Sequence, residues 1–404
     1  MTAPMVIVGA GQAGLQVAES LRAEGHDGAI VLIGEEAAAP YHRPPLSKGV
    51  LSGDMSAEQI EIRGPQALAR KGIDLRAGTR VVAIDRTARQ VRLADGDVLG
   101  YAGLALATGA RLRPLPVPGA GLAGLFGLRT LADTRALMAA LPASRRAVIV
   151  GGGFIGLEAA AVLAKQGKEI TVVEAAGRLM GRAVHPLVSA HFLELHRSHG
   201  VQVELDALVA EIQGEDGRAT GVRLADGRSF PADLVLVGVG VLANDQLAAA
   251  AGLECEGGIV VDACGRTSDP QVAAAGDCTA RRGADGGLIR LESVQNAVEQ
   301  GKAAAAALMG KERPFRAAPW FWSDQYDVKL QMVGTSQGGD RVVRRGTEGA
   351  GAFSLFHFHD GRLIGVDSLN RPDDHMAGRR ILDRPLPLSP EQAADPAFAL
   401  HDLR

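Results

Sequence analysis

Two segments of this 404-residue chain follow the same pattern, and this internal duplication constrains the fold more than any other sequence feature. Residues 6–14 read Val-Ile-Val-Gly-Ala-Gly-Gln-Ala-Gly, and residues 148–156 read Val-Ile-Val-Gly-Gly-Gly-Phe-Ile-Gly. Each is a β-branched run that ends in G-x-G-x-x-G and continues with the apolar spacing of a helix. A second short strand follows each helix and ends in an acid, Glu35 in the first copy and Glu174 in the second. The duplication therefore predicts two strand–turn–helix–strand units of one kind.

The spacing of the three glycines has a physical meaning in such a unit. The first glycine makes the turn, the second lets the backbone approach a pyrophosphate, and the third lets the helix pack tightly on the strand. Free N–H groups and the dipole at the helix N-terminus favour a diphosphate there. The acid on the next strand tip accepts hydrogen bonds from an adenosine ribose. One such motif is weak evidence, since a glycine-rich turn can serve packing alone, but two complete copies predict two bound nucleotides.

Strand-rich tracts follow both copies and indicate that one nucleotide domain interrupts the other. The first tract ends in Ala107-Thr108-Gly109 and the second in Gly238-Val239-Gly240, and each contains an Asp-Gly hairpin signal, at 95–96 and 226–227. A later strand leads into Gly276-Asp277, and both tryptophans lie in the last part of the chain. We expect an α/β protein with two Rossmann-like nucleotide-binding domains, the second inserted in the first, and a small α+β C-terminal domain. The predicted boundaries are 1–112 with 241–318, 113–240, and 319–404.

Composition and charge narrow the possible partners and compartments. The formal net charge of −3 argues against nucleic acid or an anionic membrane as a bulk electrostatic partner. No stretch approaches the ~20 uninterrupted apolar residues of a membrane span, and the start of the chain has no signal-peptide pattern, so we expect a cytoplasmic protein. Cys255, Cys264 and Cys278 are too few and too irregularly spaced for a disulfide framework or a zinc site. The histidines also lack ligand spacing, and no metal is expected.

With these pieces placed, several motifs give the chain a resemblance to a known family. They are residues 41–48 (Tyr-His-Arg-Pro-Pro-Leu-Ser-Lys), the Ala-Thr-Gly run, Gly276-Asp277-Cys278, residues 292–297 and residues 319–325. Together with the two fingerprints, they resemble the NADH-dependent, FAD-containing ferredoxin reductases of the putidaredoxin reductase-like type. Members of that family serve bacterial haem monooxygenases and aromatic-ring dioxygenases, and their fold is glutathione-reductase-like. The resemblance spans nearly the whole chain.

The resemblance implies where FAD binds. The first fingerprint with Glu35 would hold the adenosine diphosphate, Arg43 and Lys48 would flank the flavin, Asp277 would bind the ribitol, and the Val294 segment would face the pyrimidine end of the ring. A cation such as Lys48 near N5 can stabilise the charge of a reduced flavin. The full predicted FAD set is Gly9, Gly11, Gln12, Ala13, Gly14, Glu35, Arg43, Pro44, Lys48, Val82, Ala107, Thr108, Gly109, Arg129, Gly276, Asp277, Ser293, Val294 and Trp322.

The resemblance also implies an NADH site on the second fingerprint. Glu174 would pair with a free ribose 2′-hydroxyl and repel a 2′-phosphate, which predicts a preference for NADH over NADPH; Arg178 and Arg182 lie close by in sequence and weaken that inference. Glu158 resembles a family glutamate near the nicotinamide, although an ordinary helix-face acid is an equal alternative. The predicted NAD set is Gly151, Gly153, Phe154, Ile155, Gly156, Glu174, Arg182 and Gly240.

The absence of redox-active cysteines from residues 41–48 limits the activities that the chain can have. Disulfide reductases of this fold need a cysteine pair beside the flavin, but residues 41–48 contain no cysteine and the chain has no C-x-x-C. Electrons must therefore leave the flavin directly, which favours a 2Fe–2S ferredoxin as a one-electron acceptor. Two alternatives remain: an NADH oxidase or quinone-type reductase, and a non-catalytic NADH-sensing flavoprotein resembling apoptosis-inducing factor.

Trp322 and a set of basic residues are the candidates for the route to the acceptor. Trp322, with Trp320 as the second choice, would lie beside the flavin, and aromatic packing between domains is the alternative. With Lys48 and Glu158, Trp322 completes the predicted catalytic set. Basic residues would dock an acidic ferredoxin and make association sensitive to salt. The candidates are Arg290, Lys302, Lys311, Arg313 and Arg316.

Overall fold

The computed structural model describes residues 3–283, 286–347 and 351–403, and the chain forms two compact units. Unit 1 comprises Met1–His42, Glu58–Arg111 and Val241–Arg316. Unit 2 comprises Arg43–Ala57, Leu112–Gly240 and Ala317–Arg404. Among the described residues, no helix combines the length and the apolar character that crossing a membrane requires.

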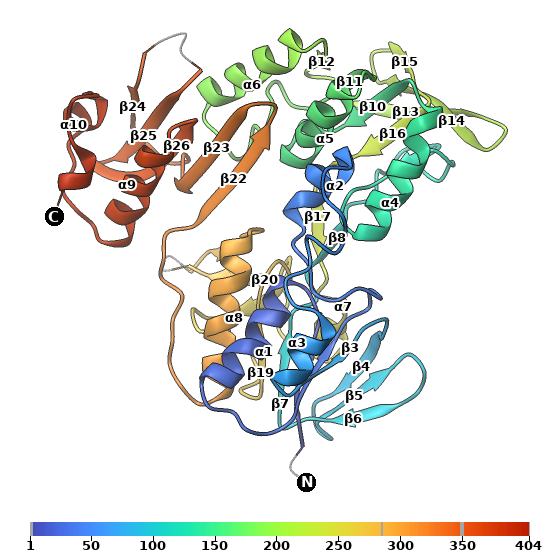
Figure 1. Ribbon diagram of the computed structural model, residues 1–404, viewed down its shortest axis with the longest axis vertical. Coiled ribbons are helices and arrows are strands. Elements are labelled where there is room, and N and C mark those ends of the chain that lie inside the picture. The colour runs from blue at the N-terminus through green and yellow to red at the C-terminus, as the bar shows by residue number, and fades with distance from the viewer. Residues whose placement is uncertain (1–2, 284–285, 348–350, 404) are drawn as a thin grey trace. The chain divides into compact units, whose positions relative to one another are not determined.

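Unit 1 is built on a five-stranded parallel sheet with the order β19-β7-β1-β2-β3. All four residues of β1 are buried, as expected for a parallel strand whose sheet is covered on both faces. Val6 and Val8 belong to the core under the antiparallel strands β4–β6, whereas Met5 and Ile7 pack with α1. Helices α1 and α8 lie side by side (Figure 1). The sheet strands are β1 (Met5–Val8), β2 (Ile30–Ile33), β3 (Ile73–Arg76), β7 (Gly103–Leu106) and β19 (Val272–Ala274). The other elements named here are β4 (Val81–Asp85), β5 (Gln90–Leu93), β6 (Val98–Gly100), α1 (Gln12–Ala23), α3 (Pro65–Arg70) and α8 (Val294–Leu308).

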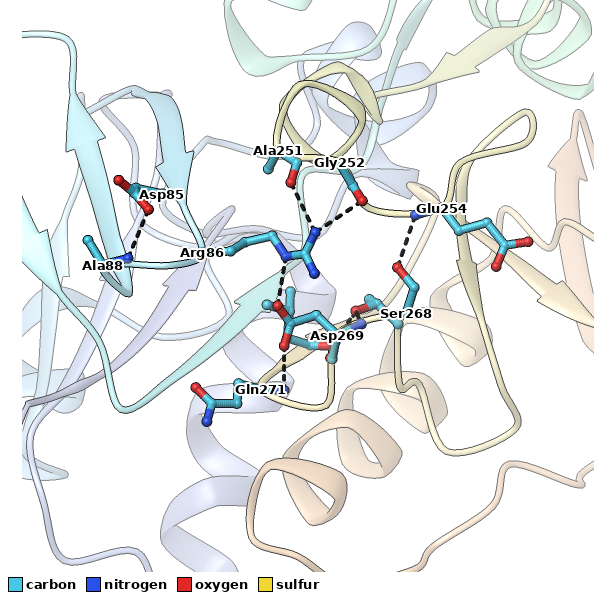
Figure 2. Close-up of polar contacts among 11 residues, drawn as sticks. Asp85, Arg86, Ala88, Ala251, Gly252, Glu254, Ser268, Asp269 and Gln271 are labelled. Atoms are coloured by element: carbon cyan, nitrogen blue, oxygen red, sulfur yellow. Dashed lines mark hydrogen bonds and ion pairs between the residues drawn. The ribbon is translucent and has the colours of Figure 1, made fainter.

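Unit 1 is discontinuous in sequence, and Arg86 joins two of its segments. Its Nε lies 2.7 Å from Asp269 Oδ2, and its Nη1 donates to the carbonyls of Ala251 and Gly252 at 3.2 and 3.1 Å (Figure 2). The other oxygen of Asp269 accepts the Gln271 backbone N–H at 3.0 Å. Burial works to raise the pKa of Asp269, but the Arg86 hydrogen bond and charge outweigh it and lower that pKa. These contacts fasten the β4–β6 region to the segment that precedes β19.

Unit 2 repeats the first architecture and adds a second sheet. Its parallel sheet has the order β12-β11-β10-β16-β9. An antiparallel sheet of order β22-β23-β26-β25-β24 forms the C-terminal part and packs with α9 and α10. The parallel strands are β9 (Leu125–Phe126), β10 (Arg146–Val150), β11 (Glu169–Val173), β12 (Gln202–Glu204) and β16 (Leu234–Val237). The C-terminal strands are β22 (Trp320–Gln325), β23 (Val328–Gly334), β24 (Arg341–Arg345), β25 (Phe353–His359) and β26 (Arg362–Leu369). The helices are α4 (Leu131–Ala140), α5 (Phe154–Lys165), α6 (Pro186–Ser198), α9 (Pro372–Asp383) and α10 (Pro390–Ala394).

The sequence expectations for the fold class are confirmed. Both fingerprints connect a strand to a helix, and both hairpins form at the predicted Asp-Gly turns, between β5 and β6 and between β14 (Arg218–Leu224) and β15 (Ser229–Pro231). The strand β13 (Val209–Glu215), which pairs with β14, was not predicted. The chain leaves unit 1 after Arg111, within β8 (Ala110–Leu112), and re-enters it at β17 (Val241–Ala243), which pairs with β8.

Candidate nucleotide-binding and redox site

The first fingerprint has two glycines fixed by packing and one that faces open space. Gly9 has φ +111°, and a Cβ there would lie 2.0 Å from the Ala107 carbonyl oxygen. A Cβ on Gly14 would lie 1.8 Å from the Gly9 carbonyl oxygen, whereas one on Gly11 would meet nothing within 4 Å. The side-chain oxygen of Gln12 is buried and has no hydrogen-bond partner among the described residues. The turn therefore leaves room at Gly11 for the close approach of a diphosphate.

The second fingerprint has the same geometry. Gly151 has φ +109°, with a Cβ position 2.4 Å from the Gly238 carbonyl oxygen, and a Cβ on Gly156 would lie 2.4 Å from the Gly151 carbonyl oxygen. Gly153 again faces open space. Gly11 and Gly153 are the N-cap residues of α1 and α5, which have no side-chain cap and no acid in the first turn. Both helix N-termini thus keep backbone N–H groups for an anion.

The acids that follow the two fingerprints differ in their surroundings. The Glu35 side chain is 70% exposed, and its Oε1 lies 3.6 Å from Arg80 Nε. Both oxygens of Glu174 accept backbone hydrogen bonds, from Gly152 N–H at 2.7 Å and from Ala176 N–H at 2.8 Å. Glu174 is therefore fixed beside its own fingerprint, whereas Glu35 is exposed and has only a long ion pair with Arg80.

The Ala107-Thr108-Gly109 run is held by a residue that sequence reasoning missed. Asn244 donates from Nδ2 to the Thr108 carbonyl at 2.9 Å, and its own carbonyl accepts the Thr108 hydroxyl at 2.6 Å. Asn244 follows β17, where the chain re-enters unit 1, so only the topology brings it here. Val82, on β4, is a large apolar side chain with 47% exposure.

Gly276 and Asp277 follow β19, where a second missed residue supports them. Gln300 on α8 accepts the Gly276 backbone N–H at 2.8 Å through Oε1. A Cβ on Gly276 would lie 2.9 Å from the Ala13 Cβ, which brings these two predicted residues together. Ser293 caps α8 by accepting the Asn296 N–H at 3.1 Å, so that Val294 opens the helix.

In unit 2, the loop that begins at Arg43 carries the predicted flavin-side residues. Arg43 Nη1 donates to the Arg129 carbonyl at 2.7 Å, which brings these two predicted residues together. Pro44 begins the short 3₁₀ helix η1 (Pro44–Ser47), since its ring favours the first helical position, and Lys48 follows directly. The loop is therefore anchored on both sides of the proline pair.

Lys48 and Glu158 form an ion pair inside unit 2. Lys48 Nζ lies 2.8 Å from Glu158 Oε2, and Glu158 is only 4% exposed. Ser47 Oγ donates to Oε2 at 2.5 Å, and Ser323 Oγ donates to Oε1 at 2.6 Å. Glu158 is thus a buried and fully engaged acid rather than a solvated helix-face acid, while its place near the nicotinamide stays a prediction. A buried carboxylate needs such partners because leaving it unpaired costs several kcal/mol, of order 3–5.

The remaining predicted residues of unit 2 lie around α5 and β22. Ile155 is 40% exposed near the start of α5, and the Phe154 ring lies 4.8 Å from that of Phe321. Trp322 is half-buried on β22, with its ring 5.6 Å from that of Trp320.

The arginines near the second fingerprint are not equivalent. Arg178 donates to the Val184 carbonyl at 2.6 Å and also to the Gly181 carbonyl, so it is committed to its own loop. Arg182 is exposed, and its Nη2 lies 3.7 Å from the Cβ position of Gly240. The structure therefore brings Arg182 and Gly240 together and removes Arg178 as a receiver of a 2′-phosphate.

Most of the proposed docking cations already have acidic partners in this chain. Arg290 pairs with Glu292 at 3.0 Å, Lys302 with Glu299 at 2.7 Å, and Lys311 and Arg313 with Glu24 at 2.8 and 3.7 Å. Arg316 is exposed. A ferredoxin would have to compete with these intramolecular acids.

Three cysteines, all in unit 1, are free: Cys255, Cys264 and Cys278. Burial raises the pKa of the Cys278 thiol, and burial also raises that of Cys255. Neither environment favours a thiolate, the nucleophilic form.

Comparison with known proteins identifies the family of the chain. Residues 3–301 match the family model described as pyridine nucleotide-disulphide oxidoreductase, and residues 320–404 match the one described as reductase C-terminal. Rhodocoxin reductase from Rhodococcus erythropolis is 48% identical over 397 residues, 98% of this chain and 93% of its own length. A ferredoxin reductase for the CYP199A2 system of Rhodopseudomonas palustris has a TM-score of 0.96 at 44% identity, with 99% of both chains covered. Putidaredoxin reductase, in a covalent complex with putidaredoxin, has a TM-score of 0.95 at 42% identity, covering 99% of this chain and 97% of its own.

The chain therefore belongs to the pyridine nucleotide-disulphide oxidoreductase family, and it is an oxidoreductase. Within that family it carries the reductase C-terminal domain, as the sequence resemblance to ferredoxin reductases predicted. The two fingerprints, each with an open middle glycine and an uncapped helix, fit the diphosphates of two cofactors, FAD and NAD(H).

Proposed function

We propose that this protein is an NADH-dependent ferredoxin reductase that delivers single electrons to a 2Fe–2S ferredoxin of a haem monooxygenase or ring-hydroxylating dioxygenase system. The observation that carries the proposal concerns the loop from Arg43 to Lys48, where thiol-dependent relatives need cysteines. That loop has no cysteine, and its Lys48 forms an ion pair with the buried Glu158 of α5. With no thiol there to accept electrons, the acceptor must come from outside the chain. The two similar solved structures, one a ferredoxin reductase and one a reductase bound to putidaredoxin, support the same conclusion.

In the proposed cycle, each turnover consumes one NADH, releases one proton and reduces two one-electron acceptors. Bound FAD supplies the chemistry that accepts a hydride and gives up electrons one at a time. The chain's own groups bind and orient: the first fingerprint holds the diphosphate of FAD, and the second holds that of NADH. Lys48, held by Glu158, provides a fixed positive charge for the reduced ring. The residues predicted above as the FAD and NAD sets, and the division at 112, 240 and 318, are part of this proposal.

The proposal includes NADH as the preferred nucleotide and the cytoplasm as the compartment. Glu174 supports the first point, because its carboxylate is held in place and would repel a 2′-phosphate. Arg178 hydrogen-bonds within its own loop, so it is not available to offset that repulsion. Arg182 is the cation that remains near the site.

An anaerobic absorbance titration of the purified protein tests the proposal. The flavin band should bleach readily with NADH and poorly with NADPH, and a 2Fe–2S ferredoxin should then restore it. A protein that takes up no flavin would contradict the family-level reading. Bleaching that oxygen or a quinone reverses, but ferredoxin does not, would identify an oxidase. A long-lived reduced complex with changed dimerisation would identify a sensor.

Ionic strength tests the docking part of the proposal. Charge-steered association predicts that the second-order rate of ferredoxin reduction falls at least several-fold between low and physiological salt. Arg316→Ala should reduce this salt dependence more than Arg290→Ala, since Arg290 already has Glu292 as a partner. A rate that does not change with salt contradicts steering by charge.

A further inference from the structure

A single file of hydrogen bonds runs through unit 2 from Glu158 to the far end of β22. Ser323 Oγ lies 2.6 Å from Glu158 Oε1, and Gln325 Nε2 lies 3.2 Å from Ser323 Oγ. His196 Nε2 lies 2.8 Å from Gln325 Oε1, and Tyr326 Oη lies 3.4 Å from His196 Nδ1. The inner members Ser323, Gln325 and His196 are fully buried. Nothing in the activity proposed above uses these four residues.

The direction of every bond in the file follows from Glu158. A carboxylate paired with a lysine accepts only, so Ser323 must donate its one hydroxyl hydrogen to it. The Ser323 oxygen is then left to accept from the Gln325 amide nitrogen, which turns the amide oxygen towards His196. An amide oxygen can only accept, so the ring hydrogen of His196 must be on Nε2. His196 Nδ1 then carries the lone pair that accepts the Tyr326 hydroxyl.

All four donors therefore point towards the same carboxylate. Hydrogen bonds arranged head to tail polarise one another in a low-dielectric interior, so each strengthens the next. The Glu158 carboxylate receives the sum of that polarisation on Oε1, while Ser47 and Lys48 engage Oε2. Its orientation, and with it the place of the Lys48 ammonium, is then set by residues on α6 and β22.

The environment of His196 suits a neutral ring in this role. Burial is the largest effect and, together with the nearby His199, lowers the pKa of His196 to about 4, although the Gln325 hydrogen bond acts to raise it. The titratable and charged groups around its outer side are His199 on the same helix, Tyr326 in the β22–β23 turn, and Lys165 of α5. The His199 and Tyr326 rings stack at 3.7 Å, and Lys165 Nζ lies 5.7 Å from the Tyr326 ring centre.

We propose that Ser323, Gln325 and His196 are positioning residues for electron transfer, forming a one-directional hydrogen-bond relay that orients Glu158 and so holds Lys48 in place. The role of Lys48 itself rests on the proposed function, but the relay does not. Loss of the relay should slow the step in which NADH reduces the flavin without weakening NADH binding, because no relay member lies on the second fingerprint.

The tautomer of His196 gives a test that does not depend on activity. Nitrogen-15 NMR of histidine-labelled, FAD-loaded protein should show His196 as the neutral Nε2–H tautomer, unchanged from pH 7.5 to 5.5. Gln325→Met, which removes the acceptor while keeping the length of the side chain, should perturb the His196 signals and leave those of His191 unchanged. An Nδ1–H tautomer, or a charged ring at neutral pH, overturns the relay.

Stopped-flow reduction by NADH, without any ferredoxin, provides the second test. The limiting rate constant should fall on the order of tenfold or more in Ser323→Ala, several-fold in Gln325→Met and less than twofold in Tyr326→Phe, with the NADH dissociation constant unchanged. His191→Phe is the matched control, since His191 lies on the same helix but its Nε2 has no hydrogen-bond partner among the described residues. Equal effects of His191→Phe and Gln325→Met, or a change confined to NADH affinity, would contradict the relay. Failure of NADH to reduce the unmodified protein would contradict the proposed function instead, with the relay still decided by NMR.

Discussion

The two units treat the polar groups around their fingerprints in opposite ways. In unit 1, the Gln12 side-chain oxygen is buried without a partner among the described residues, and Glu35 is 70% exposed. In unit 2, Glu174 accepts two backbone hydrogen bonds, and Glu158 has three protein partners. Unit 1 leaves groups for a ligand to satisfy, whereas unit 2 satisfies its own.

This difference matches the two ways in which a nucleotide can be held. A cofactor that stays bound can complete the structure around it, and its binding adds to the stability of the folded protein. A co-substrate such as NADH leaves at every turnover, so its site must keep its shape when empty. The contrast between the units is therefore what a resident FAD and an exchanging NADH would require.

Replacing the first glycine of each fingerprint with alanine should have the largest effect and should separate the two units most clearly. Gly9→Ala combines a Cβ 2.0 Å from a carbonyl oxygen with φ +111°, and Gly151→Ala combines 2.4 Å with φ +109°. Each should cost several kcal/mol, about 3 or more, because backbone must move to make room. Gly9→Ala should yield protein without flavin, whereas Gly151→Ala should keep the flavin and lose NADH binding. The flavin-to-protein absorbance ratio and an NADH titration measure the two outcomes.

Glycines at the ends of the same helices are the matched controls for that experiment. Gly25 and Gly167 also have positive φ, +93° and +77°, but a Cβ on either would meet nothing within 4 Å. Their alanine variants should cost only the left-handed strain of about 1 kcal/mol and leave both nucleotides bound. Loss of flavin in Gly25→Ala would show that strain alone explains the Gly9 result.

Mild acid should lower the stability of unit 2 more than that of unit 1. His196 and His375 are both in unit 2, and burial above all lowers the pKa of each to about 4. The unfolded state takes up a proton near pH 6.5 while the folded state does not, so stability is present above pH 6.5 and falls as the pH drops towards 4. Each histidine can remove about 2 kcal/mol between pH 7 and 5. Hydrogen exchange resolved by segment should show α6 opening before α1; the reverse order would contradict the assignment.

Removal of the two strand-tip acids should give the smallest effects. Glu174→Ala removes two charge-assisted hydrogen bonds and should lower the free energy of unfolding by about 1–3 kcal/mol. Glu35→Ala removes only a long exposed ion pair and should change it by less than about 0.5 kcal/mol. Chemical denaturation of both variants measures the free energy of unfolding. NADH affinity should fall only in Glu174→Ala. Equal losses in stability would remove the contrast between the units.

Most of the architecture followed from local sequence, and the supports of the site did not. Three glycines, a helix and an acid recur at fixed spacing, so the duplicated fold could be predicted from pattern alone. The partners of Glu158 come from residues far apart in sequence: Ser47 precedes it by 111 positions and Ser323 follows it by 165. Periodicity carries no information about such pairings.

Asn244 and Gln300 escaped prediction for a related reason. Each hydrogen-bonds to a motif that was recognised, Thr108 and Gly276 respectively, but amides near strand and helix ends are common and carry no motif of their own. The Ser323 and Gln325 positions were within a recognised run, yet only the alternation of β22 shows that both side chains lie on the buried face.

The contact of Arg86 with Asp269 also has a consequence for folding during synthesis on the ribosome. The two residues are 183 positions apart, and the edge strand β19, which completes the first sheet, begins shortly after Asp269, at Val272. When the first half of unit 1 leaves the exit tunnel, its sheet has an open edge at β7, and the whole segment Leu112–Gly240 is synthesised before the missing strand arrives. The inserted segment can therefore fold first, while the incomplete sheet of unit 1 keeps unpaired backbone groups exposed. During synthesis, the vulnerable species is an incomplete sheet, and chaperone capture or aggregation is expected in that interval.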